Sequence, residues 1–300
     1  MVAEVEAPSG GNRAQSRSML QTFVLHSHDW SETSLILDVF TRERGRIVAA
    51  AKGAKRPHSQ LRSVLLPFQR LLTSYGTRTP DDAEVWLLKH AEWAGGSAWP
   101  GGAAMLPAFY VNELLMRFLV RLEPQPVLFD VYTHTLPVLT EPAAVPAALR
   151  SFELVLMRML GHLPSLAAES ASGEVVRAGR HYALWPDVGL QTWHEGADPG
   201  ATPQCLPGEA LLAIEQALGR VKGDVARLRH TQALHDLMHA CVPVLNELKI
   251  GMRGLIHYHL GAHTLRTRQW MIELQQLTRG NTIDLPVLTP APEAEEPPAP

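Results

Sequence analysis

The sequence predicts an α+β protein in which a small N-terminal β-barrel precedes an α-helical domain. Short strand-like runs separated by turn residues occupy the stretch before residue 98, and no helical period interrupts them. From Pro100 onward, apolar residues recur at helical spacing. The 300 residues, with an apolar fraction of 46%, suffice for one large or two ordinary domains.

Five strand-like runs support the barrel. In the second run, Leu35, Leu37 and Val39 alternate with the intervening residues, which is the period of a half-buried strand. The five runs are 20–26, 34–40, 47–51, 65–75 and 84–90. Five short strands within about 75 residues are typical of an OB-type barrel. That class binds oligonucleotides with aromatic and basic side chains on an open face.

Three helices are expected next, because apolar residues repeat at helical spacing over 106–118, 129–139 and 149–160, and the face that carries Arg117 and Arg121 continues the first helix to residue 121. Pro124 and Pro126 end the first helix, since proline cannot donate the backbone hydrogen bond that continues a helix. Pro146 suits the first turn of the third helix, and Gly161 ends it. These apolar stripes indicate a helical core rather than a cofactor site.

The remainder of the chain alternates between loops and helices. Residues 162–206 show no clear period and predict a short ordered module rich in loops. Helical patterning returns over 211–218 and again over 231–260, where Pro243 predicts a bend or break. A last helix is expected over 265–277. The expected division is a disordered arm at 1–18, the barrel at 19–98, the helical domain at 99–283 and a disordered tail at 284–300.

Positive charge is concentrated in one stretch, residues 42–62, which we name the basic segment. Glu43 is its single acid, against seven cations. The cations are Arg42, Arg44, Arg46, Lys52, Lys55, Arg56 and Arg62. The other 279 residues hold 20 basic and 29 acidic side chains. Such a local concentration is expected of a surface that follows a phosphate backbone.

The pattern within the basic segment predicts a charged hairpin followed by an irregular loop. Gly45 marks the hairpin turn, and Gly53 and Pro57 interrupt regular structure after the apolar run 47–51. Long cationic side chains on such a loop suit contacts with phosphate rather than with base edges. The alternative is a strand edge that its charge keeps soluble.

The rest of the composition limits the class of function. A net charge of -3 confines any nucleic-acid role to a local surface. Cys205 and Cys241 make no disulfide framework. Neither a signal peptide nor a run of about 18 apolar residues is found, so we expect a cytoplasmic protein without membrane contact. No P-loop, Rossmann or GxSxG fingerprint occurs, and neither a catalytic residue nor a cofactor is predicted.

Two histidine pairs have the spacing of metal ligands one helical turn apart: His235 with His239, and His259 with His263. They alone would support a metal-dependent hydrolase, but no third ligand accompanies either pair, so structural histidines are favoured. The Cys241 thiol is expected to be a small buried group within its helix.

Two further pairs of residues allow a binding and a structural interpretation. Trp30 and Trp86 could stack on nucleobases, although burial is favoured for Trp86. Arg117 and Arg121 share one face of the first predicted helix with Glu113. They could flank an apolar groove and hold the carboxylates of an acidic peptide, or simply pair with Glu113 at the surface.

Several blocks of sequence occur in the order and spacing of a known family. The barrel region carries FVLHSHDWSETSLILDVFTRERGRIVAAAKGAKRP. Downstream come YVNELLMRFL, LFDVYTHTL, LRSFELVLMRMLG and RGLIHYHLGAHTLRTRQWMIEL. Together they resemble the RecO family of bacterial DNA repair proteins over about residues 19–278.

The resemblance implies an N-terminal OB-fold, a helical C-terminal domain and no catalytic centre. It implies binding to single- and double-stranded DNA, annealing of complementary strands, and action with RecR to load RecA onto DNA coated by single-strand-binding protein (SSB). The acidic, Phe-ended tail of SSB would be a further partner, with Arg117 and Arg121 as candidate contacts. The family's basic block matches Lys52, Gly53, Lys55 and Arg56. The alternative is an OB-fold RNA-binding or assembly protein whose helical domain recruits a partner.

The chain departs from the family pattern in one respect. Many members carry a four-cysteine, zinc-finger-like cluster in the region that corresponds to about 160–210. Here that region holds Cys205 as its sole cysteine, with His162, His181 and His194 at no recognisable ligand spacing. We therefore expect that this protein binds no metal and that packing stabilises the module.

Overall fold

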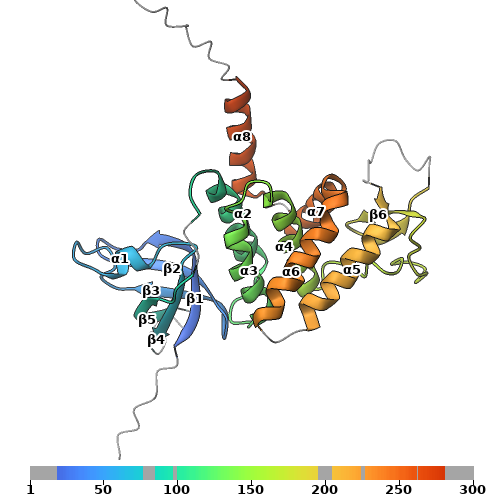
Figure 1. Ribbon diagram of the computed structural model, residues 1–300. Helices are drawn as coiled ribbons and strands as arrows, with labels where there is room; N and C mark the ends of the chain where they lie inside the picture. The colour runs from blue at the N-terminus through green and yellow to red at the C-terminus, as the bar shows by residue number, and fades with distance from the viewer. Residues whose placement is uncertain are drawn as a thin grey trace, which may run out of the picture. The chain divides into compact units, whose positions relative to one another are not determined.

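A computed structural model describes residues 19–76, 85–96, 100–194, 205–223, 227–261 and 263–280. The chain divides into two compact units, and the boundary in the sequence lies between Thr264 and Leu265. The first unit contains the barrel and the helices α2 to α7, and the second contains α8 (Arg266–Gly280) (Figure 1). The expected arm at 1–18 and tail at 284–300 lie outside the described residues, and the expected domain limits stay predictions.

The N-terminal part is a closed barrel, as the sequence predicts. Its strands are β1 (Leu20–Asp29), β2 (Leu35–Thr41), β3 (Gly45–Ala51), β4 (Arg70–Tyr75) and β5 (Val85–Trp93). The order around the barrel is β1-β2-β3-β5-β4, with β3 and β5 parallel and the other pairs antiparallel. This five-stranded arrangement has the architecture of an OB-type barrel.

Alternation along the strands builds the barrel core. Leu37 and Val39 on β2 point inward and are each 1% exposed, whereas Asp38 between them is only partly buried. The core comprises Val24, Leu37, Val39, Ile47, Ala51, Ala54, Leu65, Leu71 and Leu88. The basic segment therefore contributes three small or branched apolar residues to this core as well as its cations.

The fourth predicted strand is wrong over its first five residues. The run 65–75 was expected to be extended throughout, but β4 begins at Arg70, and a single helical turn, α1 (Leu61–Val64), precedes it. Phe68 has a φ of 67°, a left-handed conformation that a strand cannot contain. Its ring instead packs edge-on against Phe109, with centroids 4.9 Å apart.

Helices follow the barrel, and their predicted positions are confirmed. They are α2 (Met105–Phe118), α3 (Pro126–Val138), α4 (Val145–Met159), α5 (Gly208–Gly223), α6 (Arg227–Cys241) and α7 (Leu245–Leu260). The expected break near Pro243 is a 3-10 turn, η2 (Val242–Val244), between α6 and α7. Helix α4 contacts α2, α3, α5, α6 and α7 and so lies at the centre of the bundle.

The expectation that Arg117 and Arg121 lie on one helix is wrong. Helix α2 ends at Phe118, and Leu119 is extended with a ψ of 126°. At this end of the helix, Arg46 donates a hydrogen bond to the Met116 carbonyl oxygen, at 2.5 Å, which satisfies an unpaired group of the last turn. Arg121 therefore lies beyond the helix, in the segment that leads to α3.

The module at 162–206 contains a small antiparallel sheet that the sequence did not predict. Its strands are β6 (His181–Trp185), β7 (Gly189–Thr192) and β8 (Leu206–Pro207), in the order β7-β6-β8. Strand β6 packs on α7, where Leu184 and Pro186 lie beside Gly251 and Gly254. Strands of two to five residues carry too few alternations to be recognised in a sequence.

The barrel and the helical bundle meet at a polar and aromatic joint. Arg42 donates two hydrogen bonds to the Asp130 carboxylate, from Nε at 2.8 Å and from Nη2 at 2.9 Å. Asn112 on α2 donates to the Leu25 carbonyl oxygen and accepts from the Tyr132 hydroxyl. Because Asn112 and Tyr132 are nearly inaccessible to water, these bonds fix α2 and α3 against β1.

Gly45 allows the closest approach of the backbones at this joint. A Cβ at this position would overlap the Glu123 carbonyl oxygen, and the φ of Gly45 is +70°. Both facts favour glycine, which is the residue that the sequence provides at the hairpin turn. The neighbouring Leu122 amide donates to the Arg46 carbonyl oxygen at 2.9 Å, which continues the contact between the turn and the segment after α2.

Removing the Asp130 carboxylate should destabilise the fold. In Asp130→Ala, the partly buried Arg42 guanidinium loses its partner, and breaking such a pair costs about 2–4 kcal/mol of unfolding free energy. Urea denaturation followed by circular dichroism measures this change. Asp29→Ala is the matched control, because the Asp29–Lys55 pair is exposed and should contribute less than about 1 kcal/mol. Equal losses of unfolding free energy in the two variants would contradict the prediction that the Arg42–Asp130 pair stabilises the joint.

Candidate nucleic-acid interface

The basic segment starts in the β2–β3 turn, runs along β3 and ends in α1. The structure separates its seven cations into three environments. Arg42 and Arg46 belong to the joint, Arg44 lies on an aromatic ring, and the other four belong to the loop between β3 and α1 or to α1 itself. These environments determine which cations are available to a ligand.

Arg42 and Arg46 connect the barrel to the helical bundle. The hydrogen bond from Arg42 to Asp130 raises the pKa of Arg42 above its ordinary value, and the Arg46 guanidinium reaches Asp38 Oδ1 from Nη2 at 2.9 Å. The Arg46 side chain is 16% exposed. We therefore place these two arginines in the joint and leave them out of the surface proposed below.

Arg44 covers Trp86 on β5. Its guanidinium carbon lies 4.6 Å from the centroid of the Trp86 ring, which is a cation–π contact. Trp86 is partly buried and packs against the barrel core. Its ring is therefore occupied on one face by the barrel's own arginine, and Trp86 offers no open platform for a base.

The loop after β3 is ordered by its own contacts. Ala54 is 0% exposed and inserts into the barrel core. Gly53 turns the chain with a φ of +73°, and the Arg56 amide donates back to its carbonyl oxygen at 3.2 Å. Lys52, Arg56 and Arg62 remain exposed on either side of this anchor. The irregular loop predicted from the sequence is thus a series of turns that presents three cations to solvent.

Lys55 connects this loop to the loop between β1 and β2. Its Nζ lies 2.9 Å from Asp29 Oδ2 and 3.3 Å from the Ser31 carbonyl oxygen, and its amide donates to the Thr33 carbonyl oxygen. Trp30 lies between these contacts and is 56% exposed. An exposed aromatic ring therefore lies in the loop to which the basic loop is bound.

The outer face of β2 is unavailable near the joint. Phe40 is 0% exposed, and its ring packs edge-on against Phe129 of α3 with centroids 5.3 Å apart. In OB-type barrels the face of strands 2 and 3 is a usual ligand surface. Because helix α3 covers part of it here, a ligand would be contacted mainly through the loops that carry Trp30, Lys52 and Arg56.

The other candidate residues have structural environments. His235 and His239 are both exposed, and Asp236 between them accepts hydrogen bonds from Arg220 and Gln232. Cys241 is 0% exposed, and burial raises the pKa of its thiol to about 12. The expected burial of Cys241 is confirmed.

His259 stacks on His162 with ring centroids 4.1 Å apart. Burial and then the nearby His162 lower the pKa of His259. A lowered pKa favours the uncharged form of the His259 imidazole, which suits its stacking between α7 and the segment after α4. Across the described ranges, no group of three His, Cys, Asp or Glu side chains is placed to hold a metal ion.

Arg117 and Arg121 are both exposed, on α2 and beyond its end respectively. The Arg117 guanidinium lies 4.0 Å from a Glu113 carboxylate oxygen. Val120 is 64% exposed and Leu122 is 44% exposed, so two apolar side chains flank Arg121. The sequence reasoning identified the cations here but not these apolar neighbours, because a helix was expected to continue through them.

These features define an OB-type barrel with a helical C-terminal bundle and a basic, loop-borne surface. Comparison with known proteins agrees. The chain matches the family model "Recombination protein O N terminal" over residues 18–83 and "Recombination protein O C terminal" over residues 102–231.

Named relatives give the same result. The DNA repair protein RecO of a Polaromonas species is 44% identical over 257 residues, which cover 85% of this chain and 96% of the relative. RecO of Verminephrobacter eiseniae and of Delftia acidovorans are each 45% identical and cover 85% of this chain and 95% of the relative. The chain therefore belongs to the RecO family of DNA repair proteins, as its resemblance predicts. Among the described helices, none is long and apolar enough to cross a membrane.

Elemental analysis of the purified protein should find no stoichiometric zinc, and a chelator should leave its fold unchanged. The reason is the shortage of cysteine ligands in the module around β6–β8, since structural zinc sites use paired cysteines or histidines. Far-UV circular dichroism with and without a chelator measures the second point. One zinc ion per chain, with unfolding on chelation, would show this prediction to be wrong.

Proposed function

We propose that this protein is a non-enzymatic mediator of DNA repair that binds single- and double-stranded DNA and anneals complementary strands. We further propose that it acts in the cytoplasm with RecR to load RecA onto DNA coated by SSB. Membership of the RecO family supports this assignment. The observation that carries it is the ordered basic loop that exposes Lys52, Arg56 and Arg62 on an OB-type barrel.

The chemistry of this loop favours a phosphate backbone as its ligand. Three exposed cations on a chain of turns have no rigid arrangement for reading base edges, whereas phosphate can be contacted along a variable path. Trp30, 56% exposed in the adjoining loop, could add stacking on an unpaired base. Neutralising two strands on one such surface lowers their mutual repulsion, which is the mechanism that we propose for annealing.

An RNA-binding or assembly protein is the second candidate, since the OB-type barrel also serves those functions. Mixing two complementary DNA oligonucleotides with and without the protein separates the two. Acceleration of DNA pairing, in free strands and in strands coated by SSB, supports the repair function. Binding of RNA without any acceleration of DNA pairing supports the alternative.

Replacing the exposed cations should weaken DNA binding without regard to sequence. We expect Lys52→Ala/Arg56→Ala/Arg62→Ala to lose affinity about equally for unrelated oligonucleotides, because phosphate contacts carry no base information. Each lost contact should flatten the slope of log affinity against log salt by about 0.7 for a single strand. Fluorescence anisotropy at several salt concentrations measures both effects, and the rate of annealing should fall with affinity.

Lys89→Ala is the matched control, because Lys89 is an exposed cation on β5 outside the basic segment. It should change neither the affinity nor the salt slope appreciably. Stability of the triple variant should also be nearly unchanged, since exposed surface charges contribute little. If the triple variant anneals DNA like the parent with an unaltered slope, the basic segment is a solvated edge and the proposed surface is wrong.

We also propose that the helical bundle, not the barrel, receives the acidic, Phe-ended tail of SSB. Such a tail needs cations for its carboxylates and an apolar contact for its Phe. Arg117 and Arg121, with the exposed Val120 and Leu122, provide both kinds of group in one stretch of chain.

Arg117→Ala/Arg121→Ala should weaken binding of an SSB tail peptide by about ten-fold, which corresponds to the loss of one to two charge-assisted contacts. Binding of free DNA should remain largely intact. Isothermal titration with the peptide measures the first, and anisotropy the second. Arg253→Ala, at an exposed arginine on α7, is the control. Unchanged peptide affinity in the double variant would exclude these two arginines from the tail site.

A further inference from the structure

Three aromatic side chains follow one another along the end of β1 that lies away from the joint. His26, His28 and Trp30 occupy alternate positions and are all exposed, Trp30 to 56%. The rings of His26 and His28 contact each other edge to face, with their centroids 4.2 Å apart. None of the three belongs to the barrel core, so burial does not explain the row.

The strand register places this row on the outer face of the barrel. His28 pairs with Ile36 of β2, a position that alternates with the core residue Leu37. The shift in the register of β1 precedes the row. The ladder also continues beyond β1, because the Trp30 amide donates to the Ser34 carbonyl oxygen at 3.2 Å. Since alternate residues of a strand share a face, all three rings lie on the outer side.

The same outer face offers small apolar side chains and a cation beside the row. Ala50 of β3 pairs with Ile36 and therefore lies two strands away from His28. Lys52 continues this alternation just after β3 and is exposed. Because neighbouring strands are about 4.8 Å apart, the Lys52 backbone lies about 10 Å from β1. A nucleotide and a long lysine side chain can span that distance together.

Two of the acidic groups near the row are neutralised by cations. Asp38 is paired with Arg46, and Asp29 is paired with Lys55, each at 2.9 Å. Glu32 in the β1–β2 loop is exposed. A phosphate beside the row is therefore expected on the side of β3, away from the β1–β2 loop.

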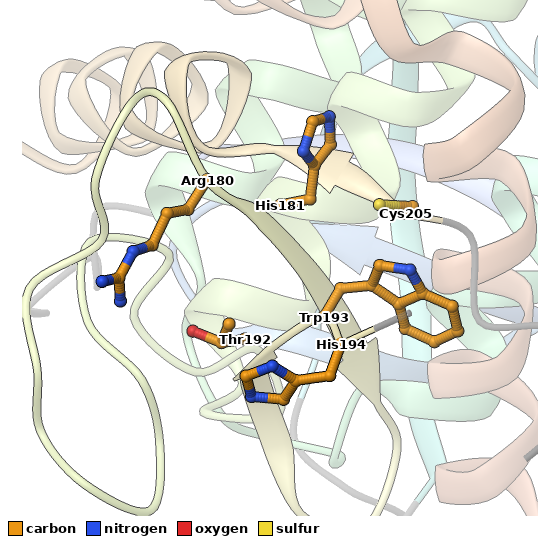
Figure 2. Close-up of a pocket in the computed structure, with 6 residues that line it drawn as sticks. All are labelled: Arg180, His181, Thr192, Trp193, His194 and Cys205. Carbon is orange, nitrogen blue, oxygen red and sulfur yellow. The ribbon is translucent and has the colours of Figure 1, made fainter. Parts of the chain in front are cut away.

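A pocket at the end of the β6–β7 pair shows how a different register separates similar residues. The pocket has a volume of about 620 Å³ and is lined by Arg180, His181, Trp193 and His194, among others (Figure 2). The Trp193 amide donates to the His181 carbonyl oxygen, so these two residues share one face of the sheet end. Arg180 and His194 alternate with them and belong to the other face. The rings there form no single row, and this pocket supplies a matched control below.

We propose that His26, His28 and Trp30 form a stacking site for the unpaired bases of a DNA strand, in which one base lies between His28 and Trp30. The inference deepens the proposed function and rests on it. Alternate residues of a strand are about 6.7 Å apart, twice the separation of about 3.4 Å between stacked bases, so one base fits between two such rings. His26 supports His28 from the other side through their edge-to-face contact.

A stacking site gives the DNA surface a preference for unpaired strands. In a duplex the faces of each base are covered by its neighbours, whereas the phosphates that the basic loop contacts are present in both forms of DNA. Stacking covers the face of a base and leaves its hydrogen-bonding edge accessible to a complementary strand. The rings therefore add selectivity for single strands without blocking their pairing.

An abasic oligonucleotide separates stacking from phosphate contact, because it keeps the phosphates of a strand and lacks its bases. Fluorescence anisotropy gives the affinity of the full-length protein for a normal and an abasic oligonucleotide of equal length. We expect the parent to bind the normal strand at least about five-fold more tightly, the effect of one stacked base. In His28→Leu/Trp30→Leu this ratio should fall towards one, with the affinity for the abasic strand and for duplex DNA unchanged.

Two further variants control for ring chemistry and for position. His28→Phe keeps an aromatic ring and should retain the parental ratio. Trp193→Leu/His194→Leu replaces the same two residue types at the pocket of Figure 2 and should also leave the ratio unchanged. Because His28 and Trp30 are exposed, replacing them should cost little stability, and far-UV circular dichroism verifies the fold of each variant.

The outcomes distinguish this inference from the proposed function. Equal ratios in the parent and in His28→Leu/Trp30→Leu would overturn the stacking site and leave the proposed function standing. An equal loss of affinity for normal and abasic strands in that variant would also overturn it, because the row would then contact phosphate. Failure of the parent to bind any form of DNA would overturn the proposed function as well.

Discussion

The structure depends on how buried polar groups find hydrogen-bond partners at the joint between the barrel and the helices. Asp130 is only 5% exposed, and Arg42 donates two hydrogen bonds to its carboxylate and neutralises the charge. An unpaired charge at such a position would cost several kcal/mol. Because the partner of Asp130 lies in the β2–β3 turn, the helical bundle fixes the barrel's orientation through the first cation of the basic segment.

This constraint divides the basic segment by function. Arg42 is paired with Asp130 at the joint, and Arg46 donates a hydrogen bond to the Met116 carbonyl oxygen in the last turn of α2. Of the cations that follow β3, Lys52, Arg56 and Arg62 are exposed to solvent. A surface defined by charge density alone would include all seven cations, whereas burial and pairing reduce it to the loop and α1. The net charge of a segment thus overstates the surface that it can offer to a ligand.

The regular elements could be predicted because their periods are local. The alternation of Leu37 with Asp38 identifies a strand, and the helical spacing in α4 identifies a buried helix, from neighbours in the sequence alone. The joint could not be predicted in this way. Arg42 and Asp130 are 88 residues apart in the sequence. The residues around each of them contain no pattern that predicts their pairing.

The remaining misses have physical causes of the same kind. The spacing of residues 117 and 121 predicts that helix α2 continues to Arg121, but the chain is extended from Leu119, and Arg46, 70 residues from Met116, satisfies the Met116 carbonyl oxygen at the helix end. Strands β6 to β8 are too short for a period, and β6 packs on α7, which is distant in the sequence. Tertiary contacts thus decided each of these outcomes against the local pattern.

The ordered state of the basic loop has consequences for binding. A loop that folds only on its ligand must supply the conformational entropy of ordering, about 1–2 kcal/mol per residue of backbone. Here Ala54 already occupies the core, and Lys55 already binds the β1–β2 loop. Lys52, Arg56 and Arg62 therefore need to order little more than their side chains. Since long side chains retain freedom on a fixed backbone, the proposed DNA surface would combine a low entropic cost of binding with tolerance of a variable phosphate path. The strand annealing that we propose would require this combination, because the bound strand must be held firmly and still be able to shift until it is in register with its complement.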